Sequence, residues 1–441
     1  MNIFCKLLNT TLDTIISLRM LRRLAFFVFC LGNLLYAQYN LNYFVNKAFD
    51  NSPVLKNYQN LGQINNLQSR LDEAENSAIK VSLTANYLFA PYFNNNGKLL
   101  STNPDPSAIG YDVGITNGGL YSTQINFEKN IFNGGLMNAL KLQRTTLKKS
   151  YQNKSDEEKH ALKKEVTDQY LGTLQNQLLY GLSSDIVNNL KDQLSITGNQ
   201  VQSGYAKAQD YLLLRVEYKT QVINLNEAQQ NYKNSLMQLY SLCGIKDTSL
   251  VKLDSVELEQ KSVNHLGSNF LTKFHLDSLS TAYQQQLFET KYQPQVGLFF
   301  NAGLNAVELD NIQRKFGISA GVNFSLPLLD GGQKDITRQQ STIAERTLGD
   351  YKSYLSHNIF IQRKNSDEKI NTLKNNLTEM ESQLKDYKNL LNISKNQLQE
   401  GNMSMVDYLT LLRNYFDLER KHITTLINYQ MEINNYNYWN W

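Results

Sequence analysis

One short pattern in the chain matches a known catalytic motif. Gly317-x-Ser319-x-Gly321 fits the nucleophile elbow of serine hydrolases, in which the serine attacks an acyl carbon. That chemistry requires a strand that turns sharply into a helix at the serine, with a histidine and an acid to complete the triad. Here the motif lies inside an alternating run that continues to Phe324, and the five histidines lie in unrelated contexts. We therefore interpret Gly317–Gly321 as part of a strand and predict no catalytic residue.

Other reactive side chains are also without a recognisable pattern. The sequence has no HExxH motif, no paired cysteines and no glycine-rich phosphate loop, so we predict neither a metal nor a cofactor site. The net charge is +4, and residues 1–37 account for +3 of it. Nucleic acid is excluded as a partner because the remaining chain has no basic patch. The hydrophobic content of 41% excludes a bundle of transmembrane helices.

The first 37 residues have the pattern of an export signal. Arg22 and Arg23 precede an apolar stretch over 24–35, and Ala37 precedes a polar chain. About 12 apolar residues are too few to span a hydrocarbon core of ~30 Å, so we expect a cleaved signal peptide over 1–37. Both Met1 and Met20 are candidate starts.

An internal repeat organises the rest of the chain. Phe127–Gly135 returns as Phe324–Gly332, which is 197 positions later, and Asn199–Gly204 returns as Asn396–Gly401 at the same offset. A constant offset over such a length indicates a tandem duplication. We predict a first structural repeat over 38–262 and a second over 263–441.

Each repeat contains two segments in which apolar and polar residues alternate, as in a strand. They cover about 79–90 and 119–130 in the first repeat, and about 294–304 and 315–327 in the second. One apolar face and one polar face at this length are typical of membrane β-barrels. Four strands cannot close, and an open edge in lipid leaves backbone groups unpaired. We therefore expect several chains to build one barrel.

Long helical stretches without proline follow the second strand of each repeat. We predict helical hairpins over about 135–243 and 332–440, with further helices over about 41–76 and 268–291. Their apolar residues, many of them tyrosines, recur at spacings of three and four, which is typical of a coiled-coil seam. We interpret these tyrosines as packing residues rather than as a ligand site.

Glycines mark the joints between these elements. Gly134-Gly135 and Gly331-Gly332 lie between a strand and a helix, where glycine permits a sharp backbone bend, and Pro327 strengthens the second bend. The hairpins turn at two further glycines. Gly204 and Gly401 end the long helices, and Asp210 and Asp407 begin the return helices, where an acid can cap free N–H groups.

Taken together, the signal, the duplicated strand and hairpin units, the Pro327–Gly332 turn and the two Gly-x5-Asp hairpin ends resemble the TolC-type outer-membrane efflux proteins. The resemblance implies a mixed α and β membrane protein, a homotrimer whose 12-stranded β-barrel lies in outer-membrane lipid and continues as a long periplasmic α-helical barrel. It implies an exit duct of a tripartite efflux or type I secretion system rather than an enzyme. Its partners would be a periplasmic adaptor and an inner-membrane RND or ABC transporter.

The resemblance also implies roles for the hairpin ends, which form the entrance of the duct. Gly204, Tyr205, Gly401 and Asn402 would belong to the surface on which the adaptor docks.

The gate residues depart from the family pattern. Asp407 matches the first gate acid, but Thr410 stands at the position of the second, and Asp210 is the equivalent acid of the outer hairpin. Met403 stands where some members carry an arginine that locks the gate. A gate in this chain must therefore rest on packing or on other pairs.

A different class of protein has some of the same features. A trimeric coiled-coil structural protein or adhesin, anchored in the outer membrane, would also combine strands with long helices. It would need only one barrel-forming segment, whereas this chain duplicates its strands between helical hairpins, which favours the duct.

Overall fold

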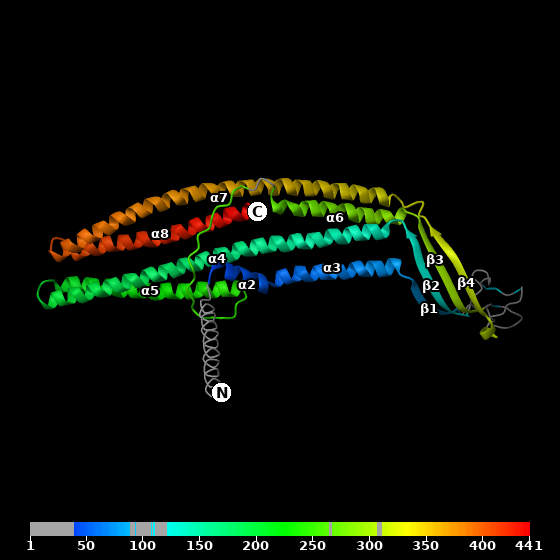
Figure 1. The fold of residues 1–441 in the computed structure, drawn as a ribbon, viewed down its shortest axis with the longest axis horizontal. Helices are drawn as coiled ribbons and strands as arrows, with labels where there is room; N and C mark the ends of the chain where they lie inside the picture. Colours follow the sequence, from blue (N-terminus) through cyan, green and yellow to red (C-terminus); the bar gives the residue numbers. More distant parts are fainter. Residues whose placement is uncertain are drawn as a thin grey trace, which may run out of the picture. The chain divides into compact units, whose positions relative to one another are not determined.

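The computed structural model describes residues 39–88, 93, 107, 109–110, 121–263, 267–306 and 311–441. The predicted signal peptide lies outside the described residues, as does most of the segment between Tyr92 and Leu120. Eleven helices and strands follow one another along the described chain (Figure 1). They are α2 (Leu41–Asn51), α3 (Pro53–Ser77), β1 (Lys80–Tyr87), β2 (Tyr121–Asn133), α4 (Leu136–Gln202), α5 (Ala208–Leu242), α6 (Thr272–Glu289), β3 (Gln295–Ala306), β4 (Phe316–Ser325), α7 (Gln333–Gln399) and α8 (Met405–Trp439), with three single-turn 3-10 helices (Asn269–Leu271, Thr290–Tyr292, Ile312–Arg314) between them.

The chain forms two compact units, each of which contains parts of both sequence repeats. The sheet unit comprises Pro53–Glu158, Asn264–Phe360 and Trp441. The hairpin unit comprises the described residues up to Ser52, with Lys159–Val263 and Ile361–Asn440. The long helices α4 and α7 each contribute residues to both units, so the compact units cut across the predicted boundary between 262 and 263.

The sheet unit is built on one antiparallel sheet with the strand order β1-β2-β3-β4. This is the mixed α and β class that the alternating segments predicted. Ser319 of the GxSxG pattern lies in the middle of β4, and no strand-to-helix turn follows it there. Gly317–Gly321 is therefore part of a strand, as predicted.

The register separates apolar and polar side chains onto opposite faces of this sheet. Phe127 pairs with Phe300, which pairs with Ala320, and Leu298 pairs with Val322. Large side chains on this face are strongly exposed, among them Ile318 (71%) and Val322 (65%). An apolar surface of this kind needs a cover, because folded proteins rarely leave large contiguous apolar patches in water.

Both strand-to-helix bends are made by glycines with positive φ. Gly134 and Gly135 have φ of 58° and 77°, and Gly331 and Gly332 have φ of 64° and 82°, a region that other residues rarely adopt. A side chain also fixes the second bend, because the carboxylate of Asp330 accepts hydrogen bonds from the N–H groups of Gly332 and Lys334, each at 2.9 Å. These bonds, the one to Lys334 first, hold the pKa of Asp330 below its usual value.

The hairpin unit contains the turn-side parts of the two helical hairpins, α4 from Lys159 onward with α5, and α7 from Ile361 onward with α8. Its main core joins α2, α4, α5 and the segment that follows α5. Phe44, Tyr170, Leu171, Leu236 and Leu239 are among its fully buried members. Tyr232, Tyr408 and Tyr436 are buried against neighbouring helices, which confirms that seam tyrosines pack the hairpins. Across the described residues, no helix is both long enough and apolar enough to cross a bilayer.

The segment Gly244–Val263 lies across these helices without forming a helix or strand of its own, and we call it the belt. Side chains of the helices form hydrogen bonds with its backbone N–H and C=O groups. Gln177 accepts a hydrogen bond from the N–H of Leu253 (2.7 Å) and donates one to its carbonyl (3.0 Å). Tyr170 donates to the carbonyl of Asp254 (2.7 Å), and Gln430 accepts from the N–H of Leu258 (2.7 Å). The belt is thereby fixed to α4 and α8.

The two faces of the sheet generate a labelling prediction. We expect cysteines at Ser319 and Asn323, on the polar face, to react with a water-soluble maleimide in the membrane-embedded protein, while cysteines at Ile318 and Val322 stay protected by lipid. The background should be Cys243→Ser, although Cys243 is fully buried and burial raises its pKa to about 12, so the native thiol should react slowly. Equal labelling at all four positions would contradict the assignment of the faces.

Candidate functional site

The ends of the two hairpins close in the same way. Gly204 and Gly401 have φ of 78° and 75°, the left-handed conformation that ends a helix. The N–H of the following residue returns to a carbonyl of the last helical turn: Tyr205 N donates to Gln200 O and Asn402 N to Gln397 O, both at 2.8 Å. The sequence therefore located both turns, and their geometry explains why glycine occupies each.

The return helices begin differently from what we predicted. Asp407 is not the cap of α8: the cap is Ser404, whose hydroxyl accepts a hydrogen bond from Asp407 N (3.1 Å) and donates one to its carboxylate (2.6 Å). Asp210 does not cap α5 either, since Lys207 holds that position without a side-chain bond. Both acids lie in the first helical turn, where the helix dipole favours negative charge.

One hollow of about 880 Å³ lies between the two hairpin ends. It is lined by six of the predicted residues: Gly204, Tyr205, Asp210, Gly401, Asn402 and Met403. Tyr205 is 88% exposed. Asp407 does not line this hollow, although it begins the same helix. The chain thus brings the predicted docking residues together at one surface, while their roles remain predictions.

Apolar packing holds the α7–α8 hairpin against the α4–α5 hairpin behind this hollow. Met405, Tyr408 and Leu409 of α8 pack with Ile186 and Leu190 of α4, and all are buried. Met403 packs against the edge of the same cluster. The hydroxyl of Tyr408 accepts a hydrogen bond from Gln193 Nε2 (2.9 Å), and burial raises its pKa.

An ion pair that the sequence did not reveal joins the same two hairpins. Arg413 of α8 donates from Nη2 and Nε to Glu217 Oε2 of α5, at 2.5 and 2.9 Å. The Glu217 side chain is only 3% exposed, whereas that of Arg413 is 56% exposed. Gln221 donates to the other oxygen of Glu217 and accepts from Arg420. Both residues look like ordinary solvated helix charges in the sequence, so no local signal distinguishes them.

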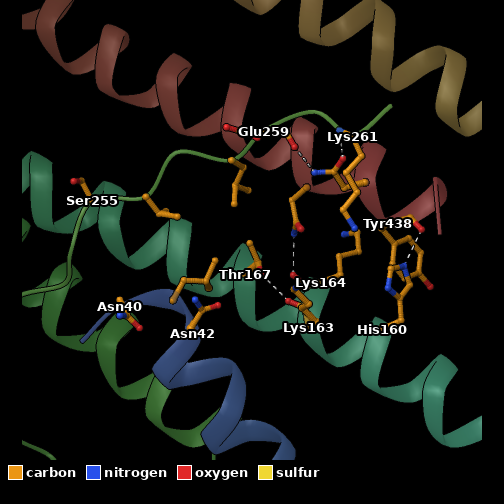
Figure 2. A pocket seen from close by; sticks show the side chains of 15 residues that line it. Asn40, Asn42, His160, Lys163, Lys164, Thr167, Ser255, Glu259, Lys261 and Tyr438 are labelled. Atoms are coloured by element: carbon orange, nitrogen blue, oxygen red, sulfur yellow. Dashed lines mark hydrogen bonds between the residues drawn. The ribbon is translucent and has the colours of Figure 1, made fainter. Parts of the chain in front are cut away.

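A second hollow, of about 420 Å³, lies where α2, α4, α8 and the belt meet. Figure 2 shows Lys163 and Lys164 of α4 in its wall together with Lys261 of the belt. The His160 ring stacks on Tyr438, with centroids 4.9 Å apart, and its Nε2 lies 2.9 Å from the Tyr438 carbonyl oxygen. Burial lowers the pKa of His160 most, against the hydrogen bond to Tyr438, and the cations Lys261 and Lys163 lower it further.

The chemistry of this second hollow is limited. Lys164 is paired with Asp168 at 2.7 Å and lies 5.8 Å from the centre of the Tyr438 ring. The arrangement gives a mildly positive surface, since three lysines and one glutamate line it. Within the described ranges, no group of three or more His, Cys, Asp or Glu residues is placed to hold a metal ion.

The ion pair between the hairpins generates a stability prediction. Arg413→Ala should lower the free energy of unfolding by about 2 kcal/mol, because it leaves the buried carboxylate of Glu217 without its cation. A double-mutant cycle with Glu217→Gln, read by urea unfolding in detergent, measures the coupling. Lys364→Ala is the control, since its partner Glu368 is 69% exposed and such pairs contribute little. Additive effects in the cycle would show that the contact is energetically neutral.

Comparison with known proteins shows which solved structures share this fold. No family model matches the sequence, and no curated protein matches it either. Solved structures do match. One is a membrane protein from Pseudomonas aeruginosa, with a TM-score of 0.70 and 14% sequence identity over 91% of this chain and 90% of that one. Another is the outer membrane protein VceC of Vibrio cholerae, with a TM-score of 0.68 and 14% identity over 91% of this chain and 96% of that one. The CmeC outer membrane channel of Campylobacter jejuni also matches, with a TM-score of 0.67 and 15% identity over 91% of this chain and 85% of that one. This chain therefore has the fold of TolC-type outer-membrane channels over nearly its whole length.

Proposed function

We propose that this chain is the outer-membrane exit duct of a tripartite efflux or type I secretion system. It would conduct substrates passively from the periplasm to the outside. The observation that carries the proposal is the sheet, which has one exposed apolar face, one polar face and the strand order of an open four-stranded sheet. A lipid-facing barrel wall needs these features, and the fold is shared with outer-membrane channels.

The proposal includes a homotrimer. β1 and β4 are each paired on one side only within the described chain, so a single copy cannot satisfy its edges in lipid. Three copies would supply twelve strands. The helices also expose apolar residues on single faces, which suits contact with another copy: Ile64, Leu67 and Leu71 of α3 are 59%, 60% and 47% exposed at spacings of three and four.

The proposed partners follow from the hairpin ends. Gly204, Tyr205, Gly401 and Asn402 line an open hollow at the turns, a concave surface on which a periplasmic adaptor could seat. The adaptor would link the duct to an inner-membrane RND or ABC transporter. The substrate would be chosen by that transporter, since a passive duct contributes no energy to selection.

The proposed gate lies at the same ends. Asp407 is exposed in the first turn of α8, and in a trimer it would recur around the axis of the entrance. Met403 cannot form an ion pair, and it packs against the apolar cluster instead. The Glu217–Arg413 ion pair joins the α4–α5 hairpin to the α7–α8 hairpin, which a methionine at position 403 cannot do through charge.

The assembly prediction is direct. Protein extracted in mild detergent should have about three times the mass of one mature chain by light scattering coupled to size exclusion. Replacing Ile64, Leu67 and Leu71 together by serine should weaken the oligomer, because it removes apolar area that a second copy would bury. A folded, monodisperse monomer of the unmodified chain would contradict the shared barrel.

The gate prediction concerns ion flow. Asp407→Ala should reduce cation selectivity in a lipid bilayer and weaken block by multivalent cations from the periplasmic side, because a ring of like charges attracts them. Asp210→Ala should have a smaller effect, since Asp210 lies on the outer hairpin. Met403→Ala should change conductance through packing alone. Unchanged selectivity and block in Asp407→Ala, with the oligomer intact, would place the gate elsewhere.

A further inference from the structure

The polar face of the sheet is chemically uniform except at one level. Cross-strand partners on this face form rows that run across all four strands. The rows toward the β1–β2 and β3–β4 connections contain only serine, threonine, asparagine, glutamine and glycine. One of them is Ser82–Asn126–Asn301–Ser319, and another is Thr84–Gln124–Gly303–Gly317. Asn126 donates to Thr84 across these rows (2.8 Å). Such side chains are short and neutral.

The next row toward the helices is different. Lys80 pairs with Glu128, Glu128 with Phe299, and Phe299 with Gly321. These are the only charged residues and the only aromatic residue on the polar face of the strands, up to the bulge after Asn130. Beyond them, Asn130 pairs with Gly297, which pairs with Asn323, and the face is neutral again. We call Lys80–Glu128–Phe299–Gly321 the mixed row.

The position of the Phe299 ring is fixed by its cross-strand partner. A Cβ added at Gly321 would overlap the ring, so the ring lies over Gly321 on the polar side of the sheet. Its neighbour Phe300 points to the opposite face, where it contacts Phe127 with ring centroids 5.8 Å apart. Phe299 is thus an aromatic platform on an otherwise hydrophilic surface, and the absence of a side chain at residue 321 leaves room for it.

We propose that the mixed row is the solute contact site of the barrel wall, a flat aromatic ring beside a carboxylate. This inference rests on the proposed function, in which the polar face lines the lumen. Threefold repetition would place three such rings and three Lys80–Glu128 pairs at one level of the pore. Solutes that carry a planar apolar ring and a positive charge fit this site, because the ring binds Phe299 and the charge binds both the carboxylate and the aromatic face.

The site is local because the side chains of the mixed row differ from the neutral side chains of the other rows. Neutral short side chains give neither a field nor an apolar surface, so a solute has no preferred position along them. At the mixed row a charge and a ring act together in a confined space, where electrostatic interactions are screened less than in bulk water. Transit should therefore slow at this level for aromatic cations and not for small ions.

The experiment compares two probe cations on single channels in a planar bilayer. Benzyltrimethylammonium should block the unmodified channel in a concentration-dependent way, while tetramethylammonium, which has the charge but lacks the ring, should block it more weakly. Phe299→Leu should raise the apparent dissociation constant of the aromatic blocker about five-fold, because it removes the ring. It keeps an apolar cover over Gly321 and therefore tests the site even if Phe299→Ala does not fold.

Matched controls separate this site from the rest of the channel. Phe300→Leu changes the neighbouring ring on the opposite face and should leave the block unchanged. Glu128→Gln should weaken the block and shift the reversal potential toward anion preference, while Glu73→Gln on α3 should do neither. Equal block in the unmodified channel and in Phe299→Leu, or equal effects of Phe299→Leu and Phe300→Leu, would overturn the mixed row as the contact site. The lack of any channel from the unmodified protein would overturn the proposed duct as well.

Discussion

The open edges of the four-stranded sheet are the constraint on which the rest of the architecture depends. Backbone N–H and C=O groups that leave water need partners, and the outer sides of β1 and β4 have none within the described chain. Every other feature of the sheet unit is consistent with an edge completed by another copy. One face is apolar and exposed, the other is polar, and the strands are joined to helices by glycines that allow the chain to leave the sheet abruptly.

The duplication gives two similar hairpins, and their differences are informative. Both turns close with a left-handed glycine and the same backbone bond. The second repeat adds side-chain support that the first lacks: Ser404 caps α8 where Lys207 makes no cap bond in α5, and Asp330 binds the start of α7. Local side-chain bonds of this kind stabilise a terminus without changing the fold, so two copies of one unit can have different local rigidity.

Local patterns in the sequence predicted the strands, the long helices and the turn glycines, because each depends on the order of neighbouring residues. Alternation identified β4, and the glycines at 204 and 401 identified the hairpin ends. The Glu217–Arg413 pair could not be predicted in the same way, because its partners lie on different helices and neither is unusual within its own. Ser404 was missed for a different reason: Asp407 is also a good capping type, and only the backbone geometry decides which residue precedes the first turn.

Gln177 shows how the path of an irregular segment is encoded far from the segment itself. Its amide group pairs with both the N–H and the carbonyl of Leu253, as the backbone of an adjacent strand would, and it also accepts a hydrogen bond from Tyr232. The information that positions the belt therefore resides largely in α4, α5 and α8. Related chains can be expected to tolerate many replacements of exposed belt residues, while a single change at Gln177 removes three hydrogen bonds at once. We therefore expect the belt to vary in sequence and its supporting residues to be retained, both as results of one arrangement.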